Sequence, residues 1–74
     1  MKELTDVENE KLTEVLHHVE EQAGEGSQAD LDDFDENMVY ISVFYDDDNT
    51  EDMKVHRSDL NSDKTAEDIA SEIG

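Results

Sequence analysis

The side chains that could do chemistry in this chain are carboxylates and histidines. Its 74 residues include 23 Asp and Glu, three His and no Cys. Paired carboxylates serve as general acid and base only where burial or neighbouring charges set their pKa values apart. With so many acids, some pairs fall at catalytic spacing by chance. The chain also lacks a Gly-rich phosphate-binding loop, so we expect no catalytic residues, no enzyme activity and no cofactor.

Two features are candidates for metal binding, the histidine pair and the acidic runs. His17 and His18 are adjacent, so on a helix they point about 100° apart and do not readily face one ion. The run DFDENM, from Asp33, resembles the start of a calcium loop, but Met38 stands at the required Gly and Phe44 at the bidentate Glu. The run DDDNTE lacks the glycine as well. We therefore expect no dedicated metal site.

The N-terminal segment, which must position the histidines, has the apolar spacing of an amphipathic helix. Apolar residues recur at steps of three and four and form one stripe. They are Leu4, Val7, Leu12, Val15, Leu16, Val19 and Ala23. Thr5 and Glu8 have the spacing of a capping box, and Gly24 is a typical helix stop. The pattern predicts a helix over about 4–22, followed by an acidic loop over 24–37.

The middle of the chain predicts an antiparallel β-hairpin. The run MVYISVFY is rich in β-branched and aromatic residues, and EDMKVHR alternates apolar with polar residues. We predict strands over about 38–45 and 52–57. Successive side chains of a strand point to opposite faces. Val39 and Val43 therefore lie on one face of the first strand, and Tyr40 and Phe44 lie on the other. Both faces carry apolar groups, so we expect this strand to be covered on both sides.

The C-terminal segment predicts a short helix over about 63–73. Leu60, Ala66, Ile69, Ala70 and Ile73 have helical spacing. Ser62 or Thr65 would cap its start. The whole chain, 1–74, is thus predicted as a single α+β domain with a long N-terminal helix, a two-stranded hairpin and a short C-terminal helix.

A two-stranded hairpin is marginal in water, so the predicted fold needs a larger core. The net charge of −18 also opposes compaction. We therefore expect a homodimer, in which hairpins join into a four-stranded sheet or long helices pack together. The candidates for the dimer interface or the core are Leu12, Val15, Leu16, Val19, Tyr40 and Phe44. The alternative is a monomer with Tyr40 and Phe44 in its core.

The charge balance limits the partners of this protein. With 23 acids against five Lys and Arg, the chain repels nucleic acids and anionic membranes and attracts basic surfaces. Its apolar stretches are too short for a membrane span and its N-terminus too acidic for a signal peptide, so we expect a cytoplasmic protein. The acidic runs are the candidate partner-binding residues: first Asp46, Asp47, Asp48, Glu51 and Asp52, and second Asp30, Asp32, Asp33, Asp35 and Glu36.

Small size, extreme acidity, the runs DLDDFDE and DDDNTED, and a helix–hairpin–helix plan resemble the phage-encoded DNA mimics. More narrowly, the whole chain looks like a small phage host-takeover protein that occupies the DNA-binding arms of HU-type nucleoid proteins. The likeness is one of character over the full length and involves no shared motif. It implies an inhibitor without catalysis, acting in the host cytoplasm or nucleoid, whose acidic side chains stand in for phosphates.

Two other functions fit the same composition. One is a small soluble domain adapted to high salt, although Lys outnumbers Arg by four to one, which weighs mildly against an extreme halophile. The other is an acidic adaptor or antitoxin-like module that binds one basic protein through its apolar helix stripe. A fold that requires molar salt favours the first, and a fold that is intact in ordinary buffer favours the mimic.

Overall fold

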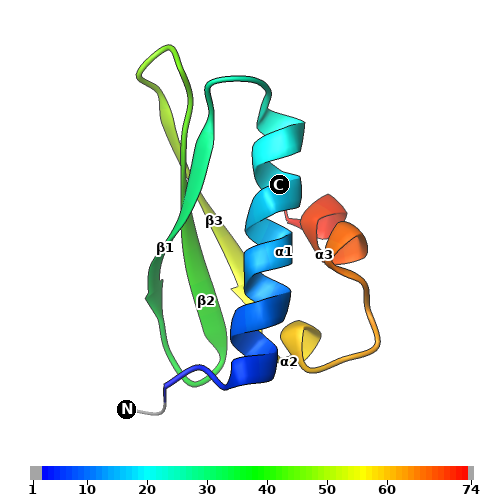
Figure 1. The fold of residues 1–74 in the computed structure, drawn as a ribbon. Helices are drawn as coiled ribbons and strands as arrows, with labels where there is room; N and C mark the ends of the chain where they lie inside the picture. Colours follow the sequence, from blue (N-terminus) through cyan, green and yellow to red (C-terminus); the bar gives the residue numbers. More distant parts are fainter. Residues whose placement is uncertain (1–2, 74) are drawn as a thin grey trace.

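The structure, a computed structural model, describes residues 3–73 of the chain. Its elements are α1 (Asp6–Ala23), β1 (Gln28–Phe34), β2 (Met38–Phe44), β3 (Thr50–His56), α2 (Arg57–Leu60) and α3 (Ala66–Glu72). The three strands form one antiparallel sheet in the order β1-β2-β3. The helix α1 lies across one face of this sheet, and α3 packs beside α1 (Figure 1). The fold is α+β, with a sheet layer and a helix layer.

The long N-terminal helix is confirmed, and it covers Asp6–Ala23 where about 4–22 was predicted. The predicted capping box and terminating glycine are both present. Thr5 Oγ1 accepts from the Glu8 N–H at 3.2 Å, and Glu8 Oε1 accepts from the Thr5 N–H at 2.8 Å. These two bonds are a complete capping box. Gly24, with φ of 102°, ends the helix and donates its N–H to the Glu20 carbonyl at 3.2 Å. Local capping therefore fixes both ends of α1.

The segment 24–37, predicted as an acidic loop, contains the strand β1. This strand pairs with β2 from Gln28, opposite Phe44, to Phe34, opposite Val39, with a β-bulge between positions 31 and 33. Because the bulge inserts one residue, the apolar positions fall at 29, 31 and 34, and the alternation typical of a strand is broken. The acids between them have low strand propensity. The predictions of a loop and of a two-stranded sheet were therefore wrong.

The core lies between the sheet and the helices. Its completely buried side chains come from every layer: Val15 of α1, Val39, Ile41 and Val43 of β2, Val55 of β3, Leu60 of α2 and Ile69 of α3. Of the predicted stripe, Leu12, Val15 and Val19 are buried and Leu16 packs partly buried against them. The unpredicted strand β1, with Ala29 buried, and the helix α3 complete a core within one chain. The apolar stripe of α1 is part of this core.

The face of the sheet that points away from α1 is open. Tyr40 and Ser42 are half-buried on this face, and Phe44 is 43% exposed. The expectation that β2 is covered on both sides was wrong, because the helices of the described chain pack on the other face (Figure 1). We call this open surface the outer face.

The C-terminal half departs from prediction mainly in the bounds of its elements. The strand β3 begins at Thr50 and the helix α3 covers only Ala66–Glu72. Between them lies α2, one turn of helix that was not predicted. Of the two candidate caps, Thr65 begins α3, and its Oγ1 accepts from the Asp68 N–H at 3.1 Å.

Candidate functional site

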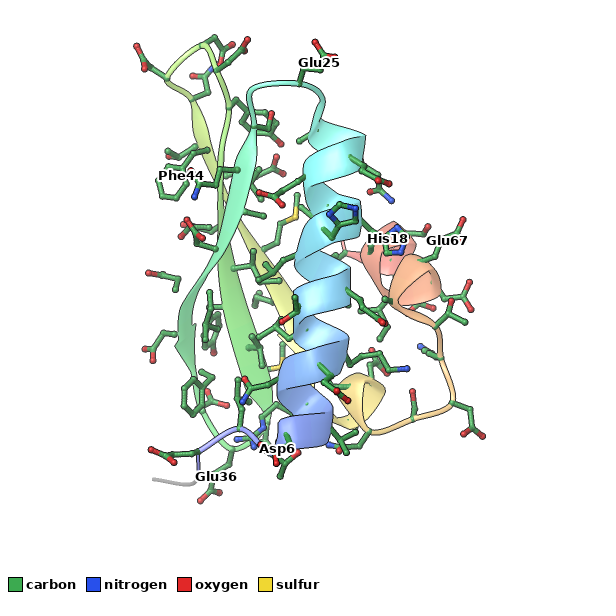
Figure 2. The ribbon with its side chains drawn as sticks, in the orientation of Figure 1. Asp6, His18, Glu25, Glu36, Phe44 and Glu67 are labelled. Carbon is green, nitrogen blue, oxygen red and sulfur yellow. The ribbon has the colours of Figure 1, made fainter. Side chains whose placement is uncertain are left out.

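The carboxylates lie almost entirely on the surface. All 23 acids fall within residues 3–73, and Glu8 alone among them is buried, while Glu20 and Asp59 are half-buried. Figure 2 shows carboxylates at both ends of the sheet, along its strands and around the helices. Negative charge therefore covers every side of the described chain, and the hydrogen bonds of each carboxylate determine where that charge is held in place.

The turn between β2 and β3 holds the densest acidic run in a loop that is closed by hydrogen bonds. The Tyr45 N–H donates to the Asn49 carbonyl at 2.9 Å, and the Asp48 N–H donates to the Tyr45 carbonyl at 3.2 Å. Asp48 has φ of 69°, so the loop resembles a three-residue hairpin loop whose last residue is left-handed. Asp47 accepts from the backbone N–H of Asn49 at 3.3 Å and from its side-chain amide at 2.9 Å. Asp47 thus stabilises the turn that presents Asp46 and Asp48.

A second acidic connection lies against this turn. A Cβ placed on Gly26 would lie 2.9 Å from the Cβ of Asp46, so the chain between α1 and β1 passes directly beside the turn. This contact brings Glu25 to the same end of the molecule as the β2–β3 turn (Figure 2). We call Glu25, Asp46, Asp47 and Asp48 the acidic end. Glu25 was not among the predicted site residues, because its place beside the turn depends on the register of β1.

The C-terminus of α1 adds to the negative potential of the acidic end. A helix C-terminus carries a partial negative charge, which basic side chains commonly offset. The last turn of α1 has no basic residue and instead carries Glu20 and Glu21. The helix dipole and the carboxylates of the acidic end therefore act in the same direction.

The second predicted cluster is divided between two places. Asp30, Asp32 and Asp33 line the edge strand β1, whereas Asp35 and Glu36 lie in the β1–β2 turn, at the end of β2 far from the acidic end (Figure 2). The structure therefore brings only the first three of these acids together along one edge.

Asp35 has a structural role in its turn. Its Oδ1 accepts from the backbone N–H of Asn37 at 2.8 Å and of Met38 at 2.7 Å, and its Oδ2 accepts from the Tyr40 hydroxyl at 3.2 Å. These bonds hold the pKa of Asp35 below its usual range, and the bond from the Asn37 N–H has the largest effect. Both oxygens of Asp35 thus accept hydrogen bonds from its own turn and from Tyr40, while the neighbouring Glu36 is exposed.

Glu51 and Asp52, the last acids of the first run, point to opposite sides of β3. Asp52 pairs in register with Ser42 and accepts from its hydroxyl at 3.5 Å, so it belongs to the outer face. Glu51 accepts from the Tyr45 hydroxyl at 2.6 Å, and this hydrogen bond raises the pKa of Tyr45. The five acids of 46–52 therefore do not form one surface.

Arg57 is buried, and its burial was not predicted from the sequence. Its guanidinium contacts both oxygens of Glu8, with Nε–Oε2 at 3.0 Å and a terminal nitrogen to Oε1 at 2.8 Å. Asn61 donates to the same carboxylate at 3.0 Å. The hydrogen bond from Arg57 is the main cause that lowers the pKa of Glu8 to about 2. The only arginine of the chain is thus neutralised inside the fold.

Two lysines are also engaged by groups of the chain itself. Lys64 lies between two carboxylates, with Nζ 2.8 Å from Glu72 Oε2 and 3.5 Å from Asp59 Oδ1. Lys11 donates its Nζ to the Lys64 carbonyl at 2.6 Å. Three of the five basic residues therefore have their charged groups bound by carboxylates or carbonyls of the chain itself.

The histidine pair lies on a flank of α1. His17 Nε2 is 3.1 Å from Glu21 Oε1, and His18 Nδ1 is 3.9 Å from the other oxygen of that carboxylate. Across residues 3–73, no group of three or more His, Asp or Glu side chains is arranged to hold a metal ion. Nor does this part of the chain contain a helix with the length and apolar content to cross a bilayer.

Comparison with known proteins places the chain in no family. No protein-family model matches it, and no curated protein or solved structure gives a significant match.

Proposed function

We propose that this protein is a non-enzymatic DNA mimic that blocks a basic DNA-binding protein, with a bacterial histone-like, HU-type nucleoid protein as the expected target. The observation that carries the proposal is the acidic end, where two connections and a helix C-terminus place negative charge together. In this proposal the carboxylates occupy the positions that phosphates take on the basic surface of the target.

The acids of the acidic end are held on a folded scaffold, which favours binding. Asp47 is fixed by Asn49, and the turn is closed by backbone bonds of Tyr45. Association costs free energy for every side chain and loop that it orders. Because this turn is ordered before the partner arrives, it loses less conformational entropy than an acidic tail would.

The spacing of acids along β1 also supports phosphate mimicry. Asp30 and Asp33 lie opposite Ser42 and Tyr40, which are two residues apart on β2. At about 3.3 Å per residue, the two acids are separated by roughly 6.6 Å along the sheet. This is comparable to the separation of successive phosphates along one DNA strand. The edge of the sheet therefore places two carboxylates at this spacing beside the acidic end.

The net charge supports binding driven by electrostatics. The chain carries −18, and Arg57 and Lys64 are paired with its own acids. A field of one sign accelerates encounter with a basic surface and makes the affinity depend steeply on salt. An adaptor that binds through the apolar stripe of α1 has no such support, because Leu12, Val15 and Val19 are buried in the core.

The homodimer stays a prediction, in a revised form. Since one chain already forms a three-stranded sheet, we expect a dimer to join two such sheets through their β3 edges. The β1 edge is the poorer choice, because its bulge and its acids discourage strand pairing. Sedimentation velocity of the purified protein measures the state directly, and a monomer at all concentrations would contradict the dimer alone.

Competition with DNA tests the proposed function. The purified protein is titrated into an HU-type protein bound to a fluorescent DNA duplex at about 50 mM salt, and anisotropy reports the displaced duplex. Because DNA binding by the target also weakens as salt rises, the salt dependence is measured on the two proteins alone, by calorimetry at about 50 and about 200 mM salt. We expect displacement at low salt and a marked loss of affinity at the higher salt. Circular dichroism at both salt concentrations distinguishes the mimic from the domain adapted to high salt. The adapted domain should be unfolded at these concentrations, whereas the mimic should be folded.

Two outcomes would reject the proposal at different levels. If DNA remains bound at a large excess of the protein at low salt, the HU-type target is wrong. If a pull-down from bacterial lysate at low salt also recovers no DNA-binding protein, the mimic function itself is wrong. Recovery of a different basic DNA-binding protein would keep the function and replace the target.

A further inference from the structure

The outer face carries an exposed aromatic ring near two carboxylates. Phe44, at the end of β2, is 43% exposed and lies on the side of the sheet away from α1 (Figure 2). The acidic turn begins two residues later, at Asp46. Exposure of a large aromatic ring beside a charged turn offers a partner apolar and electrostatic contacts in one place.

The register of the sheet places two aspartates diagonally beside Phe44. Ser42, the next outward residue of β2, lies opposite Asp30 on one side and Asp52 on the other. The hydroxyl of Ser42 donates to Asp52 at 3.5 Å, which confirms that this side chain lies on the outer face. Diagonal neighbours on a sheet are about 7–8 Å apart, within reach of one long side chain.

An arginine side chain matches this combination best. Its planar guanidinium stacks on an aromatic face and binds carboxylates with two parallel hydrogen bonds. A lysine ammonium is more strongly hydrated and acts as a point charge, so it gains less from the ring. The ring and the flanking carboxylates therefore favour arginine over lysine at equal charge.

The interior of the protein already contains an arginine bound in this way. The guanidinium carbon of Arg57 lies 5.8 Å from the ring centroid of Phe34, and the same group pairs with both oxygens of Glu8. One aromatic ring and one carboxylate thus hold an arginine within this fold. The outer face presents the same chemical groups to the outside.

We propose that the outer face binds an arginine from an extended basic segment of the partner, with its guanidinium stacked on Phe44 and paired with Asp30 or Asp52. This inference rests on the proposed function and names the residue type that the site recognises. Charge favours this occupant over a second copy of the chain. A second copy has a net charge of −18 and would be repelled by the carboxylates of this face.

Two peptides of equal charge, octa-arginine and octa-lysine, provide the test. Titrated into the protein at low salt by calorimetry, octa-arginine should bind roughly two- to fivefold more tightly, the size of one exposed cation–π contact. In Phe44→Leu this ratio should fall clearly, because the ring contact is lost while the two-point pairing of arginine with carboxylates remains, and the affinity for octa-lysine should stay unchanged. Phe44→Tyr, which keeps the ring, should retain the preference. Val7→Ala is the matched control, since Val7 is 59% exposed but lies on α1.

The outcomes separate this inference from the proposed function. Equal binding of the two peptides by the unmodified protein would overturn the arginine site, and so would an unchanged ratio of their affinities in Phe44→Leu. Neither result would contradict the proposal that the partner is basic. Failure of both peptides to bind at low salt would count against the proposed function as well. A dimer that Phe44→Leu converts to monomer in sedimentation would show that a second copy covers the face, and would also overturn the inference.

Discussion

Arg57 and Glu8 form a buried two-point ion pair that joins the first turn of α1 to α2. The contacts measure 3.0 Å from Nε to Oε2 and 2.8 Å from a terminal nitrogen to Oε1. Glu8 also closes the capping box of Thr5, and Arg57 donates to the Asp35 carbonyl at 2.8 Å. One pair of side chains thus connects a helix cap, α2 and the β1–β2 turn, at the end of the fold opposite the acidic end.

Removing the charge of Glu8 should destabilise the fold strongly. Glu8→Gln keeps the shape of the side chain but leaves the guanidinium of Arg57 buried without a counter-ion. Breaking a buried ion pair in this way costs on the order of 3 kcal/mol, a large part of the stability of a small domain. Urea denaturation followed by circular dichroism measures the loss of unfolding free energy.

The control for this substitution lies on the same helix. Glu10→Gln removes the same charge at an exposed position, and it should change the unfolding free energy by less than about 0.5 kcal/mol. Equal effects of the two substitutions would show that the Arg57 pair contributes nothing beyond the relief or loss of surface charge.

The contribution of Glu8 should depend on pH in a defined direction. Its pKa is lowered from 4.5 to about 2 in the folded protein, chiefly by the hydrogen bond from Arg57. A group with a depressed folded pKa stabilises the fold above its unfolded pKa, and this stabilisation is lost as the pH falls towards the folded pKa. The gap in stability between the unmodified protein and Glu8→Gln should be constant above about pH 5 and narrow between 4.5 and about 2.

Thermal denaturation of both proteins from neutral pH down to about pH 2.5 tests this expectation. Taking the difference between two proteins that share every other acid removes the common effect of surface protonation. A gap that stays constant down to the lowest pH would show that Glu8 is not held ionised by Arg57.

The fold was predictable from sequence where the signal is local. The capping box of Thr5 and Glu8 and the β-branched run of β2 each determine their element within a few residues. The strand β1 was not predictable in this way, because the bulge shifts its alternation and only pairing with β2 makes an acid-rich edge strand stable. The open outer face follows from the same cause, since the sequence does not state on which side of the sheet the helices pack.

The site was predictable in its composition and not in its geometry. The acidic runs of the sequence indicated which carboxylates to consider. That Asp35 accepts hydrogen bonds within its own turn is a matter of geometry, which a count of charges does not reveal. The approach of Glu25 to the β2–β3 turn depends on the contact of Gly26 with Asp46. Likewise the burial of Arg57 requires a partner 49 residues away in the chain.

The β2–β3 turn should respond in opposite directions to two substitutions of equal charge. Asp48 has φ of 69°, a conformation that glycine adopts at lower cost, so Asp48→Gly should stabilise the fold by about 0.5–1 kcal/mol. Asp47→Gly removes the hydrogen bonds to Asn49 and should destabilise it by about 1 kcal/mol. Both variants lose one negative charge, and urea denaturation compares them directly. Stabilisation by both would mean that relief of charge repulsion outweighs the geometry of the turn.

The acidic end should contribute more to partner binding than acids elsewhere on the surface. The variant Glu25→Gln, Asp46→Asn, Asp48→Asn spares Asp47, which stabilises the turn, and should weaken competition with DNA for a basic protein about tenfold or more, since each charge pair at an interface contributes on the order of 1 kcal/mol. The matched control Glu10→Gln, Glu14→Gln, Asp63→Asn removes three exposed charges from outside the acidic end. Anisotropy at one fixed low salt compares both with the unmodified protein. Equal weakening by the two triple variants would show that net charge, and not its placement at the acidic end, determines the affinity.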